Sequence, residues 1–303
     1  MYGDPIKHRA VARAFGEMVL QWIQAIARPF DGEFEPAVLL VAIQQANRPA
    51  GWEGALRPIS TTAVAQSLGV SRETTRRHVM ALEAMGLIER VADGLIAPPR
   101  LAETPAALAA RRELYGIVER FVHHLRAADI DFAQEDGPGL PSPGPEPAPR
   151  EMVLLIGRTF DHFILRWVES AIRDFDGDLR LMLVHTAVLL ANERSVLQDA
   201  RLNAFYGGFT PPPEALRRPV TINALAAMTA MPRETTRRFV ARLEAREFVD
   251  RKPTGVLAHM EGEHLQFCIQ RVIELYPNIR QFVLILRAGG AAFAGQAARQ
   301  SVA

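Results

Sequence analysis

A six-residue segment that occurs twice constrains the fold of this chain more than any other feature. Arg-Glu-Thr-Thr-Arg-Arg stands at Arg72–Arg77 and again, without change, at Arg233–Arg238. Weaker matches continue in the same register on both sides, from Arg57-Pro58-Ile59 against Arg218-Pro219-Val220 to Glu113-Leu114-Tyr115 against Glu274-Leu275-Tyr276. Self-similarity of this kind predicts two copies of one structural unit.

The N-terminal parts of the two copies also match, but in a different register. Phe15, Trp22, Phe30-Asp31-Gly32 and Ala46-Asn47 correspond to Phe160, Trp167, Phe175-Asp176-Gly177 and Ala191-Asn192. The change of register predicts an insertion in the second copy that includes residues 204–216. An aspartate in Phe-Asp-Gly is also a candidate catalytic carboxylate, but glycine just after a helix is a common stop signal, so we predict a turn.

These matches predict a mainly α fold with two tandem winged-helix units. Each unit holds a long amphipathic helix, a Phe-Asp-Gly turn, a second helix, a winged-helix core with a small two-stranded β wing, and a long closing helix. The predicted units are residues 1–133, with the winged helix at about 58–98, and residues 150–303, with the winged helix at about 219–260. Residues 134–149 are the predicted linker, because Asp136–Pro149 is rich in proline and glycine.

Size and composition fit a globular protein of this kind. The 303 residues are enough for two domains, with 49% hydrophobic and 23% charged residues. A single cysteine, Cys268, excludes internal disulfides and Cys-rich zinc modules and favours a reducing compartment. No signal peptide stands at the N-terminus, and the apolar stretches 179–191 and 281–295 are shorter than the about 20 residues of a membrane span. We expect a cytoplasmic protein without membrane contact.

The first copy of the repeated hexamer lies in a predicted helix-turn-helix. Residues 60–68 form a short amphipathic helix, and Gly69 allows the tight turn that follows. Ser71 is placed to cap the next helix, and Pro232, its counterpart in the second copy, suits a first helical turn. That next helix is expected to bury Thr75, Val79 and Leu82 and to expose Arg72, Glu73, Arg76 and Arg77. Residues 87–90 and 95–96, joined by a turn at Asp93-Gly94, read as the wing.

Residues 65–88, AQSLGVSRETTRRHVMALEAMGLI, resemble the winged-helix domains of the cyclic-nucleotide-regulated activators. That family carries a Ser-Arg-Glu-Thr-x-x-Arg recognition helix followed by a Leu-Glu-x-x-Gly-Leu-Ile segment. The resemblance covers only the winged-helix segments, and nothing upstream resembles the family's nucleotide-binding barrel. The flanking helices are laid out more like those of the multiple-antibiotic-resistance type regulators, whose outer helices form the dimer interface.

The resemblance implies that the first arginine, the glutamate and the last arginine of the motif contact base edges. These roles fall on Arg72, Glu73, Arg77, Arg233, Glu234 and Arg238. The chemistry agrees, because arginine binds guanine O6 and N7 and glutamate accepts from the cytosine amino group. Phosphate contacts are expected from Ser71, Arg76, Arg90, Arg237, Arg251 and Lys252.

The predicted function is therefore that of a sequence-specific transcriptional regulator of double-stranded DNA. With both reading heads in one chain, it would act as an intrachain pseudo-dimer on half-sites about 34 Å apart. The recognition helices differ at His78 against Phe239 and Met80 against Ala241, which predicts an imperfect palindrome. A net charge of only +1 requires the positive charge to be concentrated on a small face. A plasmid-type replication initiator and a winged-helix protein-interaction module are the alternatives.

The sequence gives little support for catalysis or for metal binding. Gly-rich phosphate loops, nucleophile elbows and His-Glu-x-x-His runs are absent, so we predict neither an enzyme nor a cofactor. His264 and Cys268 share a helix face near Glu261, and His123-His124 are further candidate ligands, but packed side chains are the preferred interpretation and no metal is predicted. A small-molecule effector near Trp22, Trp167 and residues 205–209 is left open, as is further self-association.

Overall fold

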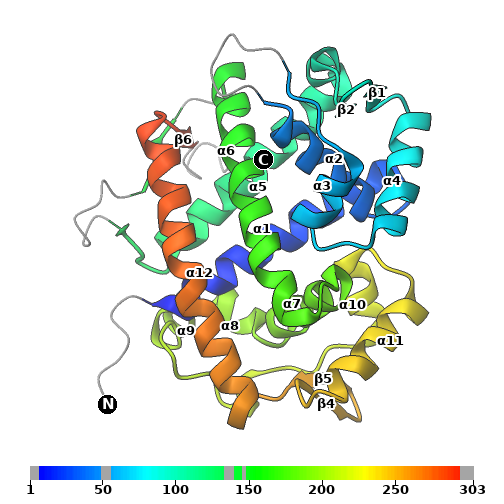
Figure 1. Ribbon diagram of the computed structural model, residues 1–303. Helices are drawn as coiled ribbons and strands as arrows, with labels where there is room; N and C mark the ends of the chain where they lie inside the picture. Colours follow the sequence, from blue (N-terminus) through cyan, green and yellow to red (C-terminus); the bar gives the residue numbers. More distant parts are fainter. Residues whose placement is uncertain (1–6, 49–55, 133–139, 145–147, 294–303) are drawn as a thin grey trace.

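The computed structural model describes residues 7–48, 56–132, 140–144 and 148–293, and it is mainly helical with small two-stranded sheets (Figure 1). The predicted fold class is confirmed. No helix in this part of the chain combines the length and the apolarity that crossing a membrane requires. We call residues 7–132 the first half and residues 148–293 the second half.

The two halves contain their main elements in the same order. The first half consists of α1 (His8–Ala27), α2 (Glu35–Ala46), α3 (Thr61–Ser67), α4 (Arg72–Ala84), β1 (Glu89–Val91), β2 (Gly94–Ile96) and α5 (Pro105–Ala127). The second half follows with α6 (Arg150–Ala171), α7 (Leu179–Asn192), α10 (Ile222–Thr229), α11 (Arg233–Glu244), β4 (Val249–Lys252), β5 (Gly255–Ala258) and α12 (Gly262–Ala288). In each half a short 3-10 turn follows the first helix.

The extra segment of the second half is longer than the sequence predicted. It already begins after α7, with α8 (Arg194–Gln198) and α9 (Ala200–Phe205), and it ends with a 3-10 turn at Glu214–Leu216. The segment covers the start of α1, where the Gly207 carbonyl accepts a 2.7 Å hydrogen bond from the Arg9 amide. One of the orphan amides at the beginning of α1 is satisfied in this way.

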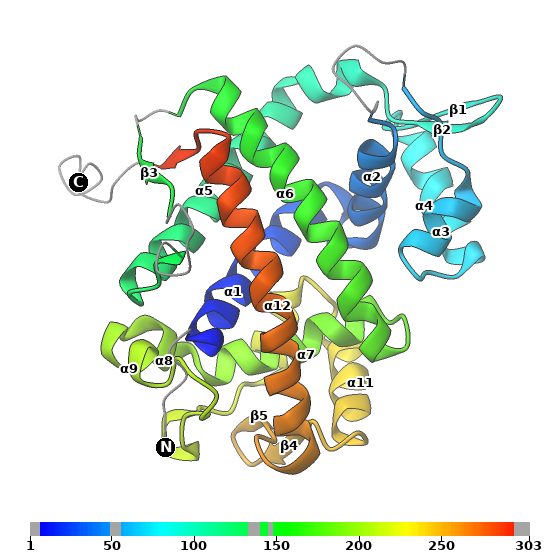
Figure 2. The same ribbon diagram turned by 60° about the vertical axis from the view of Figure 1, so that its left-hand side comes forward.

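Helices from both halves share one core. The apolar stripe of α1 is buried at Val11, Phe15, Met18 and Trp22. Helix α1 packs against α5 of its own half and against α12 of the other half, while α6 packs in the same way against α12 and α5. Figure 2 shows α12 lying beside both α6 and α1.

Aromatic rings of the two halves meet in reciprocal pairs. The ring of Phe15 lies 5.1 Å from that of Trp167, and the ring of Trp22 lies 5.5 Å from that of Phe160, both in edge-on geometry. Phe15 and Trp22 are the sequence counterparts of Phe160 and Trp167. The two pairs are therefore the same contact with the two halves exchanged. Buried aromatic pairs of this geometry stabilise an interface beyond their apolar area.

The Phe-Asp-Gly motifs are turns, as predicted. Asp31 and Asp176 adopt left-handed backbone angles, with φ of 54° and 55°. Each turn lies against the helix-turn-helix of the other half: a Cβ added at Gly32 would be 3.2 Å from the Ala230 carbonyl oxygen, and one at Gly177 would be 3.0 Å from that of Gly69. The close approach requires glycine at both positions.

Part of the predicted linker is bound by residues 292–293 and by the side chain of Arg126. Ser142–Pro143 (β3) pairs in parallel with Ala292–Phe293 (β6), and the Gly144 amide donates to the Phe293 carbonyl at 2.7 Å. The Arg126 guanidinium donates to the Pro141 carbonyl. Residues 133–139 and 145–147 of this region lie outside the described part of the chain.

A buried asparagine joins the second helix of each half to its wing. The Asn47 amide nitrogen donates to the carbonyls of Arg57 (2.8 Å) and Leu95 (3.0 Å), and its oxygen accepts from the Ala97 amide at 2.7 Å. Asn192 makes the equivalent three bonds to Arg218, Val256 and Ala258, at 2.8, 3.0 and 2.7 Å. Both asparagines are 1% exposed. Each winged helix is thus attached to the core by the same polar clamp.

We expect Asn47→Ala and Asn192→Ala each to lower the free energy of unfolding by about 3 kcal/mol. Each change leaves buried backbone groups without partners, at roughly 1–3 kcal/mol per group. Urea denaturation measures the loss. Asn223→Ala, at an exposed position of α10, is the matched control and should stay within about 0.5 kcal/mol. Losses below about 1 kcal/mol at both clamps would contradict this account of them.

Candidate nucleic-acid interface

The first helix-turn-helix consists of α3 and α4. The Ser60 hydroxyl accepts from the Ala63 amide at 3.1 Å and caps α3. Gly69 makes the turn with φ of 60°, and the Ser71 hydroxyl accepts from the Thr74 amide at 3.1 Å. The predicted cap of the recognition helix is therefore confirmed.

The second helix-turn-helix, α10 and α11, uses different residues for the same geometry. The Thr221 hydroxyl caps α10 by accepting from the Ala224 amide at 3.2 Å. Ala230 stands in the place of Gly69 and adopts the same left-handed conformation, with φ of 54°. Pro232 is the residue just before α11 and has an extended ψ of 141°. It precedes the first helical turn and does not lie within it.

Both recognition helices bury one face and expose the other. As predicted, α4 buries Thr75, Val79 and Leu82, and α11 buries the corresponding Thr236, Val240 and Leu243. The exposed residues are Arg72, Glu73, Arg76 and Arg77 on α4, and Arg233, Glu234, Arg237 and Arg238 on α11. Two identical charged surfaces therefore face the solvent.

Within each surface, one arginine is paired with the glutamate. Glu73 accepts from Arg76 at 2.7 Å, and Glu234 accepts from Arg237 at 2.6 Å, each one helical turn apart. These hydrogen bonds lower the pKa of both glutamates. Arg72, Arg77, Arg233 and Arg238 form no hydrogen bond or ion pair with another described residue. Their guanidinium donors are available to a ligand.

The predicted phosphate contacts of the wings are engaged in exposed ion pairs. Arg90 lies 3.0 Å from Glu83, Arg251 lies 2.7 Å from Glu244, and Lys252 lies 3.3 Å from Glu214. Exposed pairs of this kind contribute about 0–1 kcal/mol, so exchanging a carboxylate for a phosphate costs little. The assignment of these side chains to phosphates, and of the helix residues to bases, stays a prediction.

The two expected differences between the recognition helices differ in exposure, since His78 is buried while its counterpart Phe239 is only partly buried. His78 is buried, 4% exposed, and burial lowers the pKa of its imidazole. His78 therefore cannot read a base, contrary to the interpretation that it distinguishes the heads. Met80 is 54% exposed, and its counterpart Ala241 is also exposed. The size of the side chain at this position is the visible difference.

We call each helix-turn-helix with its wing a head. The first head (α3, α4, β1 and β2) and the second head (α10, α11, β4 and β5) lie along one edge of the molecule. In Figure 1 α4 lies above α11, with the β1–β2 wing beyond α4 and the β4–β5 wing beyond α11. Figure 2 keeps the same order, with the wings at opposite ends and the recognition helices between them. Both recognition helices thus lie along the same edge of the molecule.

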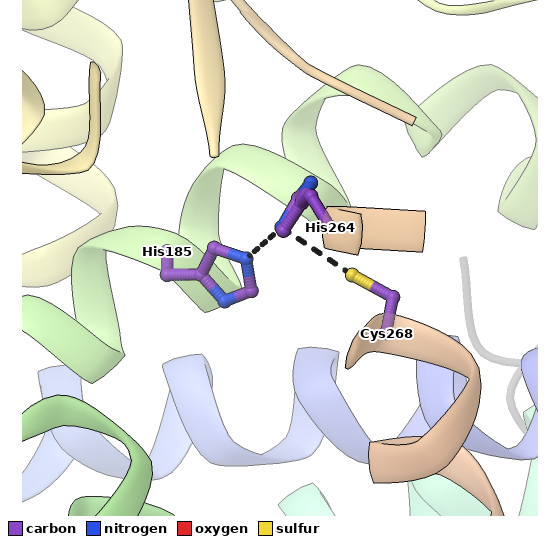
Figure 3. A group of neighbouring side chains, drawn as sticks. All are labelled: His185, His264 and Cys268. Atoms are coloured by element: carbon purple, nitrogen blue, oxygen red, sulfur yellow. Dashed lines mark hydrogen bonds between the residues drawn. The ribbon is translucent and has the colours of Figure 1, made fainter. Parts of the chain in front are cut away.

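A compact group of metal-binding side chains lies behind the second head (Figure 3). His264 and Cys268 lie on one face of α12, as predicted, and His185 of α7 joins them. Burial raises the pKa of the Cys268 thiol to about 12 and lowers that of His185. Glu261 is exposed, and His123-His124 lie on α5; neither belongs to this group.

A cavity of about 170 Å³ lies between α1, α6, α7 and α12. Its lining includes Trp167, Phe15, His185 and Cys268. Trp22 and residues 205–209, which the sequence suggested as lining an effector pocket, do not contribute to it. Phe205 is instead 79% exposed.

Comparison with known proteins identifies the first head. Residues 55–99 match the DeoR-like helix-turn-helix domain, a range that includes α3, α4 and the β1–β2 wing. No curated protein and no solved structure matches the chain. The domain match supports a DNA-binding, helix-turn-helix transcriptional regulator whose partner is double-stranded DNA. The likeness to the cyclic-nucleotide-regulated activators stays a prediction.

We expect Gly69→Ala and Ala230→Gly to change stability in opposite directions. Alanine at the left-handed Gly69 costs roughly 1–2 kcal/mol, and its Cβ would lie 3.0 Å from Cδ1 of Ile172. Glycine at position 230 relieves the same strain, offset by about 0.4–1 kcal/mol of chain entropy, for a net gain of up to about 1.6 kcal/mol. Urea midpoints measure both. Two shifts of the same sign would contradict the common turn geometry.

Proposed function

We propose that this chain is a sequence-specific transcriptional regulator that acts as an intrachain pseudo-dimer. The two halves are copies of one unit produced by internal duplication, and each contributes one recognition helix. The site read is an imperfect palindrome whose half-sites are related but not identical. The identical, exposed and unpaired arginines of the two recognition helices are the observation that carries the proposal.

The contacts between the halves support the dimer-like arrangement. Phe15 meets Trp167 where Trp22 meets Phe160, as equivalent residues do across a two-fold axis. Phe121 lies 6.4 Å from its own counterpart Phe282, which is the contact expected close to such an axis. Each half also places its Phe-Asp-Gly turn against the helix-turn-helix of the other.

The charges of the recognition helices support base reading by the first and last arginines of the motif. Arg72 and Arg77, like Arg233 and Arg238, keep free donors that can bind guanine in bidentate fashion. Glu73 and Glu234 are proposed to accept a hydrogen bond from the cytosine amino group. In that state Arg76 and Arg237 leave the two carboxylates and bind phosphates of the DNA. Salt bridges at this exposure are weak enough for the exchange.

Binding-site selection from random duplexes should return a two-part site, and head-specific variants should separate its halves. Arg72→Ala/Arg77→Ala is expected to relax selection in one half-site, and Arg233→Ala/Arg238→Ala in the other. Each arginine lost from a base contact weakens binding roughly 5- to 150-fold, equivalent to about 1–3 kcal/mol. Fluorescence anisotropy on the selected duplex measures the loss.

The control for this experiment is Arg112→Ala/Arg166→Ala, which removes two exposed arginines of α5 and α6 and should leave binding unchanged. Normal binding by both head variants would exclude base reading by these residues. A uniform loss on all duplexes would reassign them to phosphates. Recruitment of proteins without any duplex selectivity would favour the interaction-module alternative.

A single chain should occupy the whole site. Native mass spectrometry of the full-length chain with the selected duplex is expected to show one chain per duplex at saturation. The reason is that both recognition helices belong to one covalent unit whose halves share a core. A complex of two chains on one minimal two-part site, each protecting one half in footprinting, would refute the intrachain pseudo-dimer while leaving DNA binding intact.

A further inference from the structure

Three buried side chains from two helices converge behind the second head. Nε2 of His185 lies 2.9 Å from Nε2 of His264, which in turn lies 3.4 Å from Sγ of Cys268. Figure 3 shows the three side chains pointing toward one another from α7 and α12. All three ligand atoms lie within 4.8 Å of one another, and all three residues are buried.

Two neighbours approach one acceptor atom in this group. Nδ1 of His264 lies 2.5 Å from the His259 carbonyl oxygen, which can only accept, so Nδ1 carries the hydrogen. Nε2 of a neutral imidazole then has one lone pair, in the ring plane. His185 and Cys268 both approach that single lone pair. A metal ion bound by all three atoms removes the competition.

The residue types and the surroundings favour zinc. Two imidazoles and one thiolate form a ligand set that Zn²⁺ accepts in tetrahedral geometry, with bonds of about 2.0–2.3 Å that place neighbouring ligand atoms about 3.3–3.6 Å apart. The two histidine nitrogens, 2.9 Å apart, need to separate by about half an ångström to admit the ion, and the 3.4 Å between His264 and Cys268 already fits. The bond from His264 to a backbone carbonyl is the usual second-shell contact of a metal-bound histidine.

The group belongs to the second half alone. In the register of the repeat, Leu40 stands in the place of His185, Glu103 in that of His264, and Ala107 in that of Cys268. In the first half Leu40 and Ala107 are half-buried and Glu103 is exposed, so no equivalent buried group exists there. The ligands are an addition to the shared fold.

We propose that His185, His264 and Cys268 form a zinc site with three protein ligands. His185 and Cys268 both line the cavity of about 170 Å³, so the fourth position is taken by water or by a small ligand in that cavity. The ion joins α7 to α12 and, through the His259 carbonyl, to the end of β5. The site thus lies at the base of the second winged helix.

Cobalt spectroscopy tests the site on the unmodified protein. The tag-free, full-length chain is reduced, stripped with a chelator and titrated with Co²⁺. We expect one Co²⁺ per chain, tetrahedral d–d absorption and a thiolate-to-cobalt charge-transfer band, all abolished by one equivalent of Zn²⁺. Because Cys268 is the only cysteine of the chain, a charge-transfer band can come from no other residue. Absence of the band with the thiol reduced would overturn the proposal.

Variants then separate the ligands from their neighbours. His185→Ala and His264→Ala should each weaken Co²⁺ binding by more than about 100-fold, the upper end of what loss of a second-shell partner costs. His162→Ala, an exposed histidine of α6, is the matched control and should bind like the unmodified chain. Unchanged affinity in folded His185→Ala and His264→Ala, checked by circular dichroism, would also overturn the site. If these variants do not fold, the band and the stoichiometry of the unmodified chain decide.

Discussion

The position of both recognition helices depends on the aromatic contact between α1 and α6. Phe15, Trp22 and Phe160 are buried apolar side chains, and together with Trp167 they join the two helices in edge-on ring contacts. The same packing brings the Phe-Asp-Gly turn of each half against the helix-turn-helix of the other, with the glycines Gly32 and Gly177 at the closest points. The separation of the heads is therefore determined by a shared core.

Buried charges make this contact specific for unlike halves. Glu193, at the end of α7, is held by Arg9 and Arg13 of α1, and Asp161 of α6 is held by Arg48 and Arg111. Both carboxylates belong to the second half and all four arginines to the first. Burial would raise the pKa of Glu193, but the two arginines keep it below its ordinary value. Removal of the partners of either carboxylate would leave a buried charge unpaired, at about 3–5 kcal/mol for each broken pair. The buried charges of the two halves are thus complementary to each other.

The repeat made most of the local structure predictable, because turns, caps and exposed faces depend on residues close in sequence. The Phe-Asp-Gly turns, the Ser71 cap and the outward arginines follow from such patterns. Long-range partners left no local signal. His185 lies 79 residues from His264 along the chain. In the sequence, Arg9 and Arg13 look like exposed basic residues near the N-terminus, because their partner Glu193 is about 180 residues away. His78 was misread because polarity alone does not show that a helix position faces the core. The sequence did not predict α8 as a separate helix. Residues 194–198 have no aligned counterpart in the first copy, so they look like a continuation of α7.

Because the separation between the two heads is fixed, the DNA and not the protein must change shape when the half-site spacing does not fit. A regulator with a flexible linker can change its half-site spacing, whereas here the clamps at Asn47 and Asn192 attach each winged helix to one core. In the proposed complex, a spacing that does not fit must be corrected by bending or twisting the duplex, at about 1–6 kcal/mol for a bend of 40–90°. The base pairs between the half-sites then contribute to specificity although no side chain touches them. A modest net charge is compatible with the proposed recognition, which assigns selectivity to geometry and to four exposed arginines of the recognition helices, and not to a general excess of positive charge.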